Sequence, residues 1–186
     1  YKARLVAKGF SQKYQLHYDE TFAPVVKYVT LRMVIALAKL MGWRVQLLDV
    51  KTAFLYGELK ELLFMVIPEG MELEGDFDCL QLLRSLYGLK QASRVWNETF
   101  DSFVQSLGFQ VSKYDPCLYT LTVDGMCVVL VVYVDDVLVT GTCDAMVDQV
   151  KQHLKSRFEM SDAGDCKFVL GIEVVHDATD GSVTLC

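Results

Sequence analysis

Long hydrophobic runs are missing from this sequence. The longest strongly apolar stretch runs only from Cys127 to Val134, whereas a helix that crosses a bilayer needs about 20 apolar residues. The chain opens with Tyr-Lys-Ala-Arg, and these charges are not followed by the long apolar h-region of a signal peptide. We therefore expect neither a membrane-spanning helix nor a signal peptide. Since there is no initiator Met and the end "GSVTLC" is strand-like, we interpret the chain as a fragment of a longer polypeptide.

Metal-type cysteine pairs are also missing. The six cysteines form no C-x-x-C pair, and the three histidines, at 17, 153 and 176, are scattered. Most of the cysteines have apolar neighbours. This pattern argues against a zinc site or a disulfide framework, and it favours reduced core thiols in an intracellular protein.

Acidic residues outnumber basic residues over the whole chain. Neither an internal repeat nor a low-complexity linker is present. The net charge of −6 over 186 residues argues mildly against nucleic-acid binding. The distribution of charge matters more than its total: Lys2, Arg4, Lys8 and Lys13 lie in the first 13 residues, which contain no acid. An apolar content of 52% is ample for one packed domain.

Hydrophobic periodicity predicts alternating strands and helices. Strands are predicted over residues 2–10, 45–50, 118–122, 126–134, 137–140, 167–175 and 182–186. Helices are predicted over residues 30–40, between Thr30 as N-cap and Gly42, over 92–107, ended by Gly108, and after Asp144, with Val147, Val150 and Leu154 on one face. From residue 45 the order is β-α-β-β-α-β. This order predicts an α+β fold, a split βαβ unit with helices on one face of an antiparallel sheet.

Two adjacent carboxylates interrupt the most apolar part of the chain. In "YVDDVLVTG" (133–141), Asp135 and Asp136 stand between two apolar runs. A two-residue turn at this pair would project both carboxylates from the end of the sheet. Their repulsion and desolvation would be offset by a divalent cation such as Mg²⁺, which prefers hard oxygen ligands. An ordinary turn is the alternative, because Asp is common in turns.

A third carboxylate ends a neighbouring strand. Asp49 closes the strand predicted over 45–50, which lies beside the hairpin in the βαββ order. Asp49 and Asp135 could then share two metal ions about 3.5–4 Å apart, the arrangement that serves in-line phosphoryl transfer. The alternative is an acid that caps the following segment.

The residues around these acids resemble the reverse transcriptase of copia-type (Pseudoviridae) LTR retrotransposon Pol polyproteins. The matching stretches are "KARLVAKGFSQ" (2–12), "YDETFAPVVK" (18–27), "LDVKTAFLYGEL" (48–59), "PEG" (68–70), "SLYGLKQASRVWN" (85–97), "DPCLY" (115–119), "YVDDVLVTG" (133–141) and "LGIEV" (170–174). The resemblance implies the fingers and palm of a right-hand polymerase, without its thumb or RNase H domain, in residues 1–186. Such a fragment is expected to have little processive activity alone.

The resemblance also implies roles for individual residues. Asp49 and Asp135 would be the principal ligands of two Mg²⁺ ions, for which Mn²⁺ could substitute, with Asp136 as the third catalytic acid. Val50 would add its backbone carbonyl. The implied partners are an RNA template, a DNA primer, a dNTP and the rest of the Pol polyprotein, including RNase H and integrase, in a cytoplasmic virus-like particle, with no membrane.

Other implied roles concern nucleotide and primer. Lys2 and Arg4 would grip the triphosphate, Phe54 would lie under the sugar, and Gln91 would hydrogen-bond the nucleotide or template. Residues Leu170, Gly171 and Ile172 would form the primer grip. The alternatives are a solvated basic strand for the first two residues, a core position for Phe54, and an ordinary apolar strand with a bulge glycine for residues 170–172. We expect Trp96 to be core, because it shares the apolar stripe of its helix.

Some positions depart from the family pattern. Gln15 stands where Gly is usual, His17 where Asp is usual, and Leu82 and Leu83 where Lys is common. The two leucines remove positive charge, which leaves open a decayed element copy whose active site is intact but whose affinity for template is weakened. A separate alternative is a catalytically decayed remnant that only binds nucleic acid. A different Mg²⁺-dependent palm enzyme, such as a nucleotide cyclase, would need its own glycine-rich signature beside the acids, and none is found.

Overall fold

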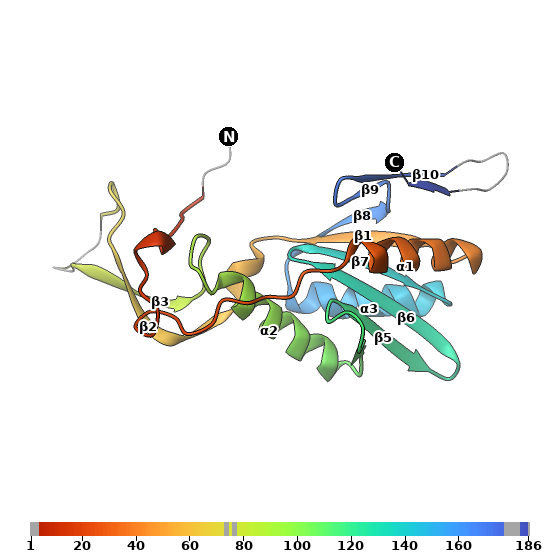
Figure 1. Ribbon diagram of the computed structural model, residues 1–186, viewed down its shortest axis with the longest axis horizontal. Coiled ribbons are helices and arrows are strands. Elements are labelled where there is room, and N and C mark those ends of the chain that lie inside the picture. Colours follow the sequence, from red (N-terminus) through yellow and green to blue (C-terminus); the bar gives the residue numbers. More distant parts are fainter. Residues whose placement is uncertain (1–3, 73–74, 76–77, 177–182, 186) are drawn as a thin grey trace. The chain divides into compact units, whose positions relative to one another are not determined.

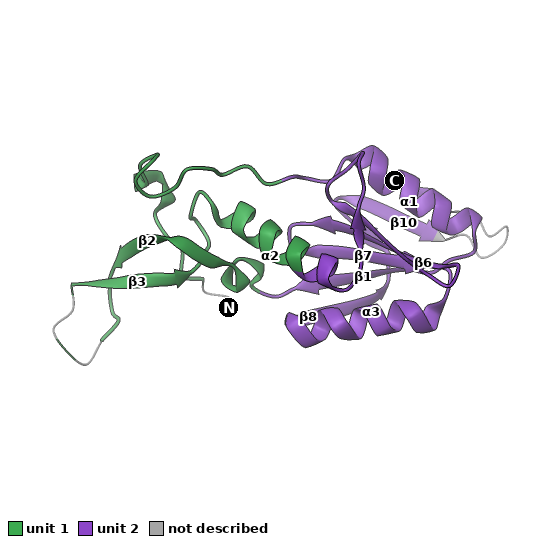
Figure 2. Ribbon diagram, turned by 90° about the horizontal axis from the view of Figure 1, so that it is seen from below, with its two compact units in different colours: residues 1–23, 52–102 green, residues 24–51, 103–186 purple. Residues whose placement is uncertain are grey.

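The chain folds into two compact units. The computed structural model describes residues 4–72, 75, 78–176 and 183–185 (Figure 1). Unit 1 comprises Tyr1–Ala23 and Thr52–Ser102, and unit 2 comprises Pro24–Lys51 and Phe103–Cys186 (Figure 2). Within the described residues, no helix has the length and apolar character needed to cross a membrane.

Unit 2 is built on a six-stranded antiparallel sheet. Its spatial order is β4 (Gln110–Val111), β5 (Leu118–Val123), β6 (Met126–Tyr133), β7 (Asp136–Gly141), β1 (Val45–Val50) and β8 (Met160–Asp165). The first strand of the chain thus lies between β7 and β8, and β6 and β7 form a hairpin. This is the split βαβ arrangement that the sequence predicts.

Helices cover both faces of this sheet. The α1 helix (Tyr28–Leu40) buries Leu31, Val34 and Ile35 in one cluster with Val131 and Leu138 of the sheet. The α3 helix (Asp144–Arg157) lies on the opposite side, as Figure 2 shows. The prediction of helices on one face concerns the chain from residue 45 onward, and α1, which precedes that part, covers the second face. The reason is visible in β6, whose apolar run does not alternate with polar residues, as is typical of a strand buried on both faces.

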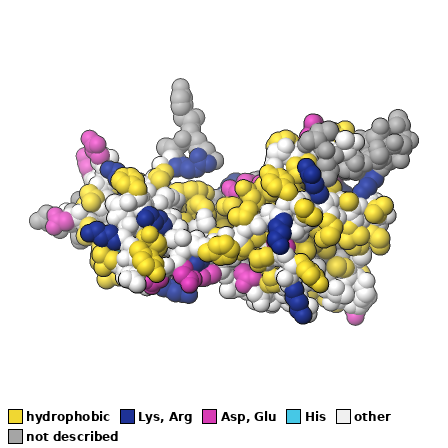
Figure 3. All heavy atoms as spheres, in the orientation of Figure 1, with side chains coloured by type: hydrophobic (Ala, Val, Ile, Leu, Met, Phe, Trp, Pro, Cys, Tyr) yellow, Lys and Arg dark blue, Asp and Glu magenta, His cyan; other side chains and the backbone are white. Residues whose placement is uncertain are grey.

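The outward side of α1 is also apolar. Val29, Met33 and Leu40 are all more than half exposed, and Figure 3 shows hydrophobic side chains gathered over this part of unit 2. The helix begins two residues before the predicted N-cap, Thr30, because Asp115 accepts a hydrogen bond from the Lys27 amide at 3.0 Å. An acid from a distant loop therefore replaces the local cap.

The C-terminal part of unit 2 forms a separate three-stranded sheet. Its order is β11 (Val183–Leu185), β10 (Ile172–His176) and β9 (Phe168–Val169). The single strand predicted over 167–175 is broken by a turn at Leu170 and Gly171, which have φ of 51° and 79°. The predicted strand over 182–186 is observed in its described part.

Unit 1 contains a two-stranded sheet of β2 (Glu58–Val66) and β3 (Cys79–Arg84), with the short 3-10 helices η1 (Gly9–Ser11) and η2 (Ala53–Tyr56). The helix α2 (Ala92–Ser106) begins in this unit. It ends near the predicted residue, and Gly108 follows it with φ of 93°.

The strand predicted over residues 2–10 is wrong within its described part. Residues 4–8 have no strand partner, and η1 follows them. The Ala7 amide donates to the carbonyl of Tyr87 at 2.7 Å. A side chain on Gly9 or Gly88 would overlap the backbone of the other segment. The segment thus crosses the 87–88 loop at close range instead of joining a sheet.

The expectation of core cysteines is met in part, since Cys79 is exposed and Cys127 and Cys143 are half-buried. The cysteines in the described residues are free thiols, and Cys117 and Cys166 are buried in unit 2. Burial, with a smaller effect from Asp115, raises the pKa of Cys117 to about 12. Burial likewise raises the pKa of Cys166 to about 11. Both groups are neutral core thiols at ordinary pH.

Candidate active site

The acidic hairpin turns one residue earlier than predicted. Tyr133 pairs with Asp136, so the two turn residues are Val134 and Asp135. Val134 has a φ of 52°, a left-handed conformation that is rare for a β-branched residue. Asp136 is the first residue of β7. The turn therefore carries one carboxylate, and the strand carries the other.

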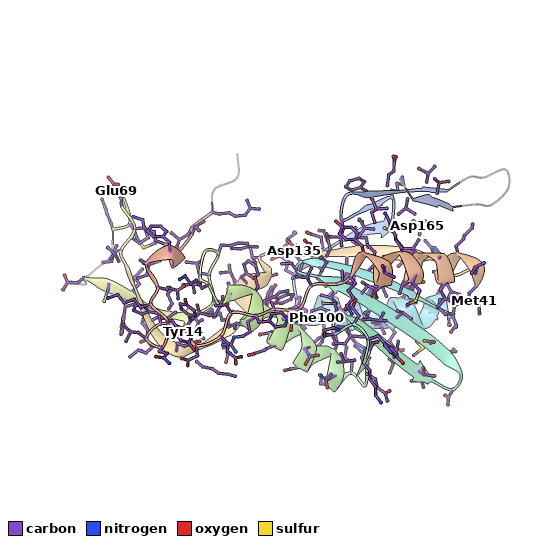
Figure 4. All side chains as sticks on the ribbon, viewed as in Figure 1. Tyr14, Met41, Glu69, Phe100, Asp135 and Asp165 are labelled. Atoms are coloured by element: carbon purple, nitrogen blue, oxygen red, sulfur yellow. The ribbon has the colours of Figure 1, made fainter. Side chains whose placement is uncertain are left out.

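Asp49 and Asp136 lie directly opposite each other on paired strands. Because opposite residues of antiparallel strands project to the same face, the two carboxylates share one side of the sheet. The Val50 amide donates to the carbonyl of Asp135 at 2.8 Å, which ties the turn to the end of β1. Figure 4 shows Asp135 at this end of the sheet. The structure thus brings the three predicted acids together.

The arrangement destabilises negative charge. Burial, and then repulsion by Asp135 and Asp49, raises the pKa of Asp136 above its ordinary value. A cation beside these groups would offset both effects. Carboxylate oxygens are also the ligands that Mg²⁺ prefers, so the chemistry of the donors fits a hard divalent ion.

The three acids do not form a closed coordination shell. Among the described residues, no three His, Cys, Asp or Glu side chains are placed as ligands of a single ion. The fit to a metal therefore rests on the paired carboxylates of Asp49 and Asp136 and on their neighbour in the turn. Val50, whose backbone carbonyl was assigned to a metal, is buried at the end of β1.

Ser161 is a site residue that the sequence analysis missed. It lies on β8 opposite Asp49, and its hydroxyl donates a hydrogen bond to Oδ2 of that residue at 3.1 Å. Only the pairing of β8 with β1 brings these residues together, and no local signal in the sequence marks it.

The residues assigned to the nucleotide belong to unit 1. Phe54 packs against Tyr87 with ring centroids 4.7 Å apart and also contacts a buried cluster that includes Leu63 and Leu86. The guanidinium of Arg4 lies 5.9 Å from the centre of the Tyr87 ring. Lys2 lies outside the described residues. The assignments to the triphosphate and the sugar stay predictions.

Gln91 is fully buried in unit 1. Its amide nitrogen donates to the carbonyl of His17 at 2.9 Å, and its oxygen accepts from Gln12 at 3.0 Å. The side chain thus joins the 12–17 segment to the start of α2. Its predicted contact with nucleotide or template stays a prediction.

The other residues at the start of α2 have partners within unit 1. Arg94 bonds to Glu98 at 2.6 Å and lies 3.6 Å from Glu61, so its charge is neutralised by acids. Lys90 lies over the Tyr18 ring at 4.9 Å. Trp96 is buried, which confirms its predicted core position.

Residues 170–172 form a hairpin. Val169 pairs with Ile172, and both are buried in the cluster that includes α1. The Tyr28 hydroxyl lies 3.3 Å from the carbonyl oxygen of Leu170 and donates a hydrogen bond to it. A two-residue turn at Leu170 and Gly171 therefore replaces the alternative of one strand with a bulge glycine. The primer-grip role of residues 170–172 stays a prediction.

Comparison with known proteins identifies the family of this chain. Residues 1–186 match the family described as reverse transcriptase (RNA-dependent DNA polymerase). The chain belongs to this reverse transcriptase family. The match confirms the resemblance drawn from the "YVDD" box and its companion stretches, and it favours this family over a nucleotide cyclase.

Relatives of this reverse transcriptase chain come from transposons. It is 41% identical to the retrovirus-related Pol polyprotein from transposon TNT 1-94 of Nicotiana tabacum, with 100% of the chain and 14% of that polyprotein covered. It is 38% identical to the Pol polyprotein from transposon RE1 of Arabidopsis thaliana, over 93% of the chain and 12% of the relative. The transposon Ty1-GR1 Gag-Pol polyprotein of Saccharomyces cerevisiae is 25% identical over 95% of the chain and 10% of its own length. The chain thus spans a small part of each relative. No solved structure matches it.

Proposed function

We propose that this chain carries the polymerase site of a copia-type Pol polyprotein, an RNA-directed DNA polymerase that extends a primer by two-metal nucleotidyl transfer. The observation that supports this most strongly is the pairing of Asp49 with Asp136, with Asp135 in the adjoining turn. Family membership gives these acids a context in which paired carboxylates serve phosphoryl transfer.

In this proposal each acid has a separate task. Asp49 and Asp135 hold the ions from β1 and from the turn, and Val50 adds its backbone carbonyl. Asp136, whose pKa is raised by burial and by the other two acids, is the third carboxylate, and nearby positive charge would favour its ionised form. When bound, two Mg²⁺ ions, or Mn²⁺ in their place, would activate the primer 3′-hydroxyl and stabilise the leaving pyrophosphate.

The two units take the places of fingers and palm. Unit 2, with the acidic site and the split βαβ sheet, is the palm, and its 170–172 hairpin is the primer grip. Unit 1 is the fingers. There Arg4, together with Lys2, binds the triphosphate, because a guanidinium can bind phosphate through two hydrogen bonds, and Phe54 lies by the sugar. Gln91 supports the nucleotide site through the 12–17 segment to which it is bonded.

The partners follow from the same proposal. An RNA template, a DNA primer and dNTPs are the substrates, and the rest of the Pol polyprotein, including RNase H and integrase, completes the enzyme inside a cytoplasmic virus-like particle. The Pol polyproteins to which the chain is similar are far longer than the chain itself.

A second candidate is a remnant that binds nucleic acid without catalysis. Leu83, which is 70% exposed on β3 at a position where the family resemblance leads us to expect lysine, marks a departure from the family pattern, but it weakens the binding on which this candidate depends. Exposed leucine in place of lysine weakens attraction to phosphates, because neutralised phosphates supply much of the affinity for nucleic acid.

Primer extension on an RNA template by the full-length protein tests the proposal. Asp135→Asn is expected to reduce extension by several orders of magnitude, because it removes a metal ligand. Template binding should stay near the wild-type level, since no phosphate contact is lost, and should fall steeply with salt. A mutant that keeps about a tenth of the wild-type rate would show that Asp135 holds no ion. An inactive wild-type protein that still binds template would favour the remnant.

A further inference from the structure

Asp49 has a neighbour on each side in the sheet. It pairs with Asp136 across β7 and with Ser161 across β8. Directly opposite residues of antiparallel strands project to one face, so the three side chains form a row. The Ser161 hydroxyl donates to Oδ2 of Asp49 at 3.1 Å. This hydrogen bond orients the Asp49 carboxylate through Oδ2, so that Oδ1 remains available to bind a cation.

A β-bulge in β8 places a serine, instead of an acid, at this end of the row. The register of β8 against β1 shifts so that Ala163 has no opposite residue. An unbroken ladder would set Asp162 opposite Asp49 and add a fourth acid to the site, because a shift of one residue turns every side chain to the other face. With the bulge, a hydrogen-bond donor stands beside the carboxylate instead.

Residues on both sides of Ser161 are anchored, one on β8 and one just before it. On one side, Asp162 accepts hydrogen bonds from Lys151 at 2.8 Å and from Lys155 at 2.7 Å. On the other side, the backbone carbonyl of Glu159 accepts from the Lys51 amide at 2.8 Å, and the two side chains form an ion pair at 3.0 Å. The position of the serine hydroxyl is therefore fixed by α3 as well as by β1.

We propose that Ser161 is a positioning residue of the polymerase site, which orients the Asp49 carboxylate so that its second oxygen meets the divalent ion. This inference rests on the proposed function. Residues that orient metal ligands typically change metal affinity or activity 10–100-fold when they are lost. Ser161 would act in the same way, through Asp49 and without contact with substrate.

Binding of Mn²⁺ alone, followed by electron paramagnetic resonance on this 186-residue chain, tests the inference without a turnover assay. Thr and Val have nearly the same shape and both suit a strand, so Ser161→Thr and Ser161→Val differ mainly in the hydroxyl. We expect Ser161→Thr to bind Mn²⁺ like the wild type and Ser161→Val to bind on the order of tenfold more weakly. Ser156→Ala is the matched control, because that hydroxyl donates within α3 to the carbonyl of His153.

A second readout separates orientation from stability. In the full-length protein, primer extension by Ser161→Val should recover at raised Mg²⁺ concentration, whereas a loss caused by unfolding would not respond to the ion. Equal Mn²⁺ affinity of the Thr and Val variants, with binding that still depends on Asp49, would overturn the role of Ser161 alone. Mn²⁺ binding that Asp49→Asn leaves unchanged would overturn both this role and the proposed metal site.

Discussion

Lys151 donates a hydrogen bond to Asp162 at 2.8 Å, from a side chain that is only 9% exposed. The same ammonium group bonds to Oε1 of Gln46 on β1 at 2.6 Å, and Lys155 adds a second bond to the carboxylate. This network connects α3 to the two strands that carry Asp49 and Ser161. It fixes the register of β8 and hence the geometry of the proposed metal site.

Asp162→Asn is expected to destabilise unit 2 by about 2 kcal/mol, because it weakens a charge-assisted hydrogen bond and leaves a buried ammonium with only the more distant carboxylate of exposed Asp148, 4.0 Å away. Burial alone would raise the pKa of Asp162, but hydrogen bonds from Lys151 and Lys155 and from the Gly164 amide lower it well below its usual range. The unfolded carboxyl has a pKa of about 3.9. The stabilisation is therefore fully present above that pH and is lost as the pH falls further toward the folded value.

Urea unfolding of both proteins between about pH 2 and pH 6 measures this difference, since the unfolded pKa lies inside that range. The free energy of unfolding of the wild type should fall more steeply below pH 4 than that of Asp162→Asn. The control is Asp165→Asn on the same strand. Its partner Arg44 and Asp165 itself are each more than half exposed, so the cost should stay below about 1 kcal/mol. Equal costs for the two substitutions would contradict the role given to Lys151.

Asp115→Ala should loosen the start of α1. The carboxylate is 1% exposed and accepts hydrogen bonds from the amides of Lys27 and Cys117, both at 3.0 Å. Its removal leaves one buried donor, the Cys117 amide, and one part-buried donor, the Lys27 amide, without their acceptor, which we expect to cost about 2–3 kcal/mol. Asp148→Ala, at an exposed acid of α3, should cost much less. Thermal unfolding of the two variants gives the comparison, and equal melting temperatures would argue against the cap.

The sequence predicts the parts of the site that depend on local pattern. The strand Val45–Val50 is observed with its predicted bounds, because alternation and the acid at its end are local features. The turn is misplaced by one residue, because Val134 adopts a left-handed conformation that local preference disfavours. Ser161 could not be found in this way, since its contact with Asp49 depends on the bulge at Ala163.

Features of the fold that local pattern does not predict have a similar origin. Residues 4–8 look like a strand, but close passage against Gly88 gives them another partner. The position of α1 on the second face of the sheet follows from clustering of Leu31 and Ile35 with Val131. Contacts of this kind join residues about a hundred positions apart, so they cannot be predicted from the periodicity within one segment.

Gln15→Gly is expected to stabilise unit 1. Gln15 has a φ of 62°, a left-handed conformation that costs a residue with a side chain about 1–2 kcal/mol and costs glycine almost nothing. Greater freedom of glycine in the unfolded chain cancels part of the gain, so a net gain of about 0.5–1 kcal/mol should remain. The same substitution at exposed Gln152 in α3 should instead cost about 1 kcal/mol. Opposite shifts in melting temperature are the expected result, and a loss of stability in both would refute the strain at Gln15.

Phe54→Val tests whether unit 1 contributes a sugar gate. If the ring lies against C2′ of the incoming nucleotide, a shorter side chain admits a 2′-hydroxyl that the phenyl group would clash with. Ribonucleotide use should then rise markedly relative to deoxynucleotide use. The measurement is the ratio of the two in single-nucleotide extension by the full-length protein, for wild type and mutant.

This test needs a control for lost packing, because Phe54 also contacts Tyr87 and the buried cluster of unit 1. The substitution should therefore cost about 1–2 kcal/mol of stability as well. Leu59→Val shortens another residue packed on that cluster and should lower stability without changing the ratio. A gate predicts a changed ratio for Phe54→Val alone, whereas an unchanged ratio in both variants would make Phe54 a core residue. Such a result would also contradict the placement of residues 48–59 beside the nucleotide, because Phe54 lies in that stretch and its role follows from the same family resemblance.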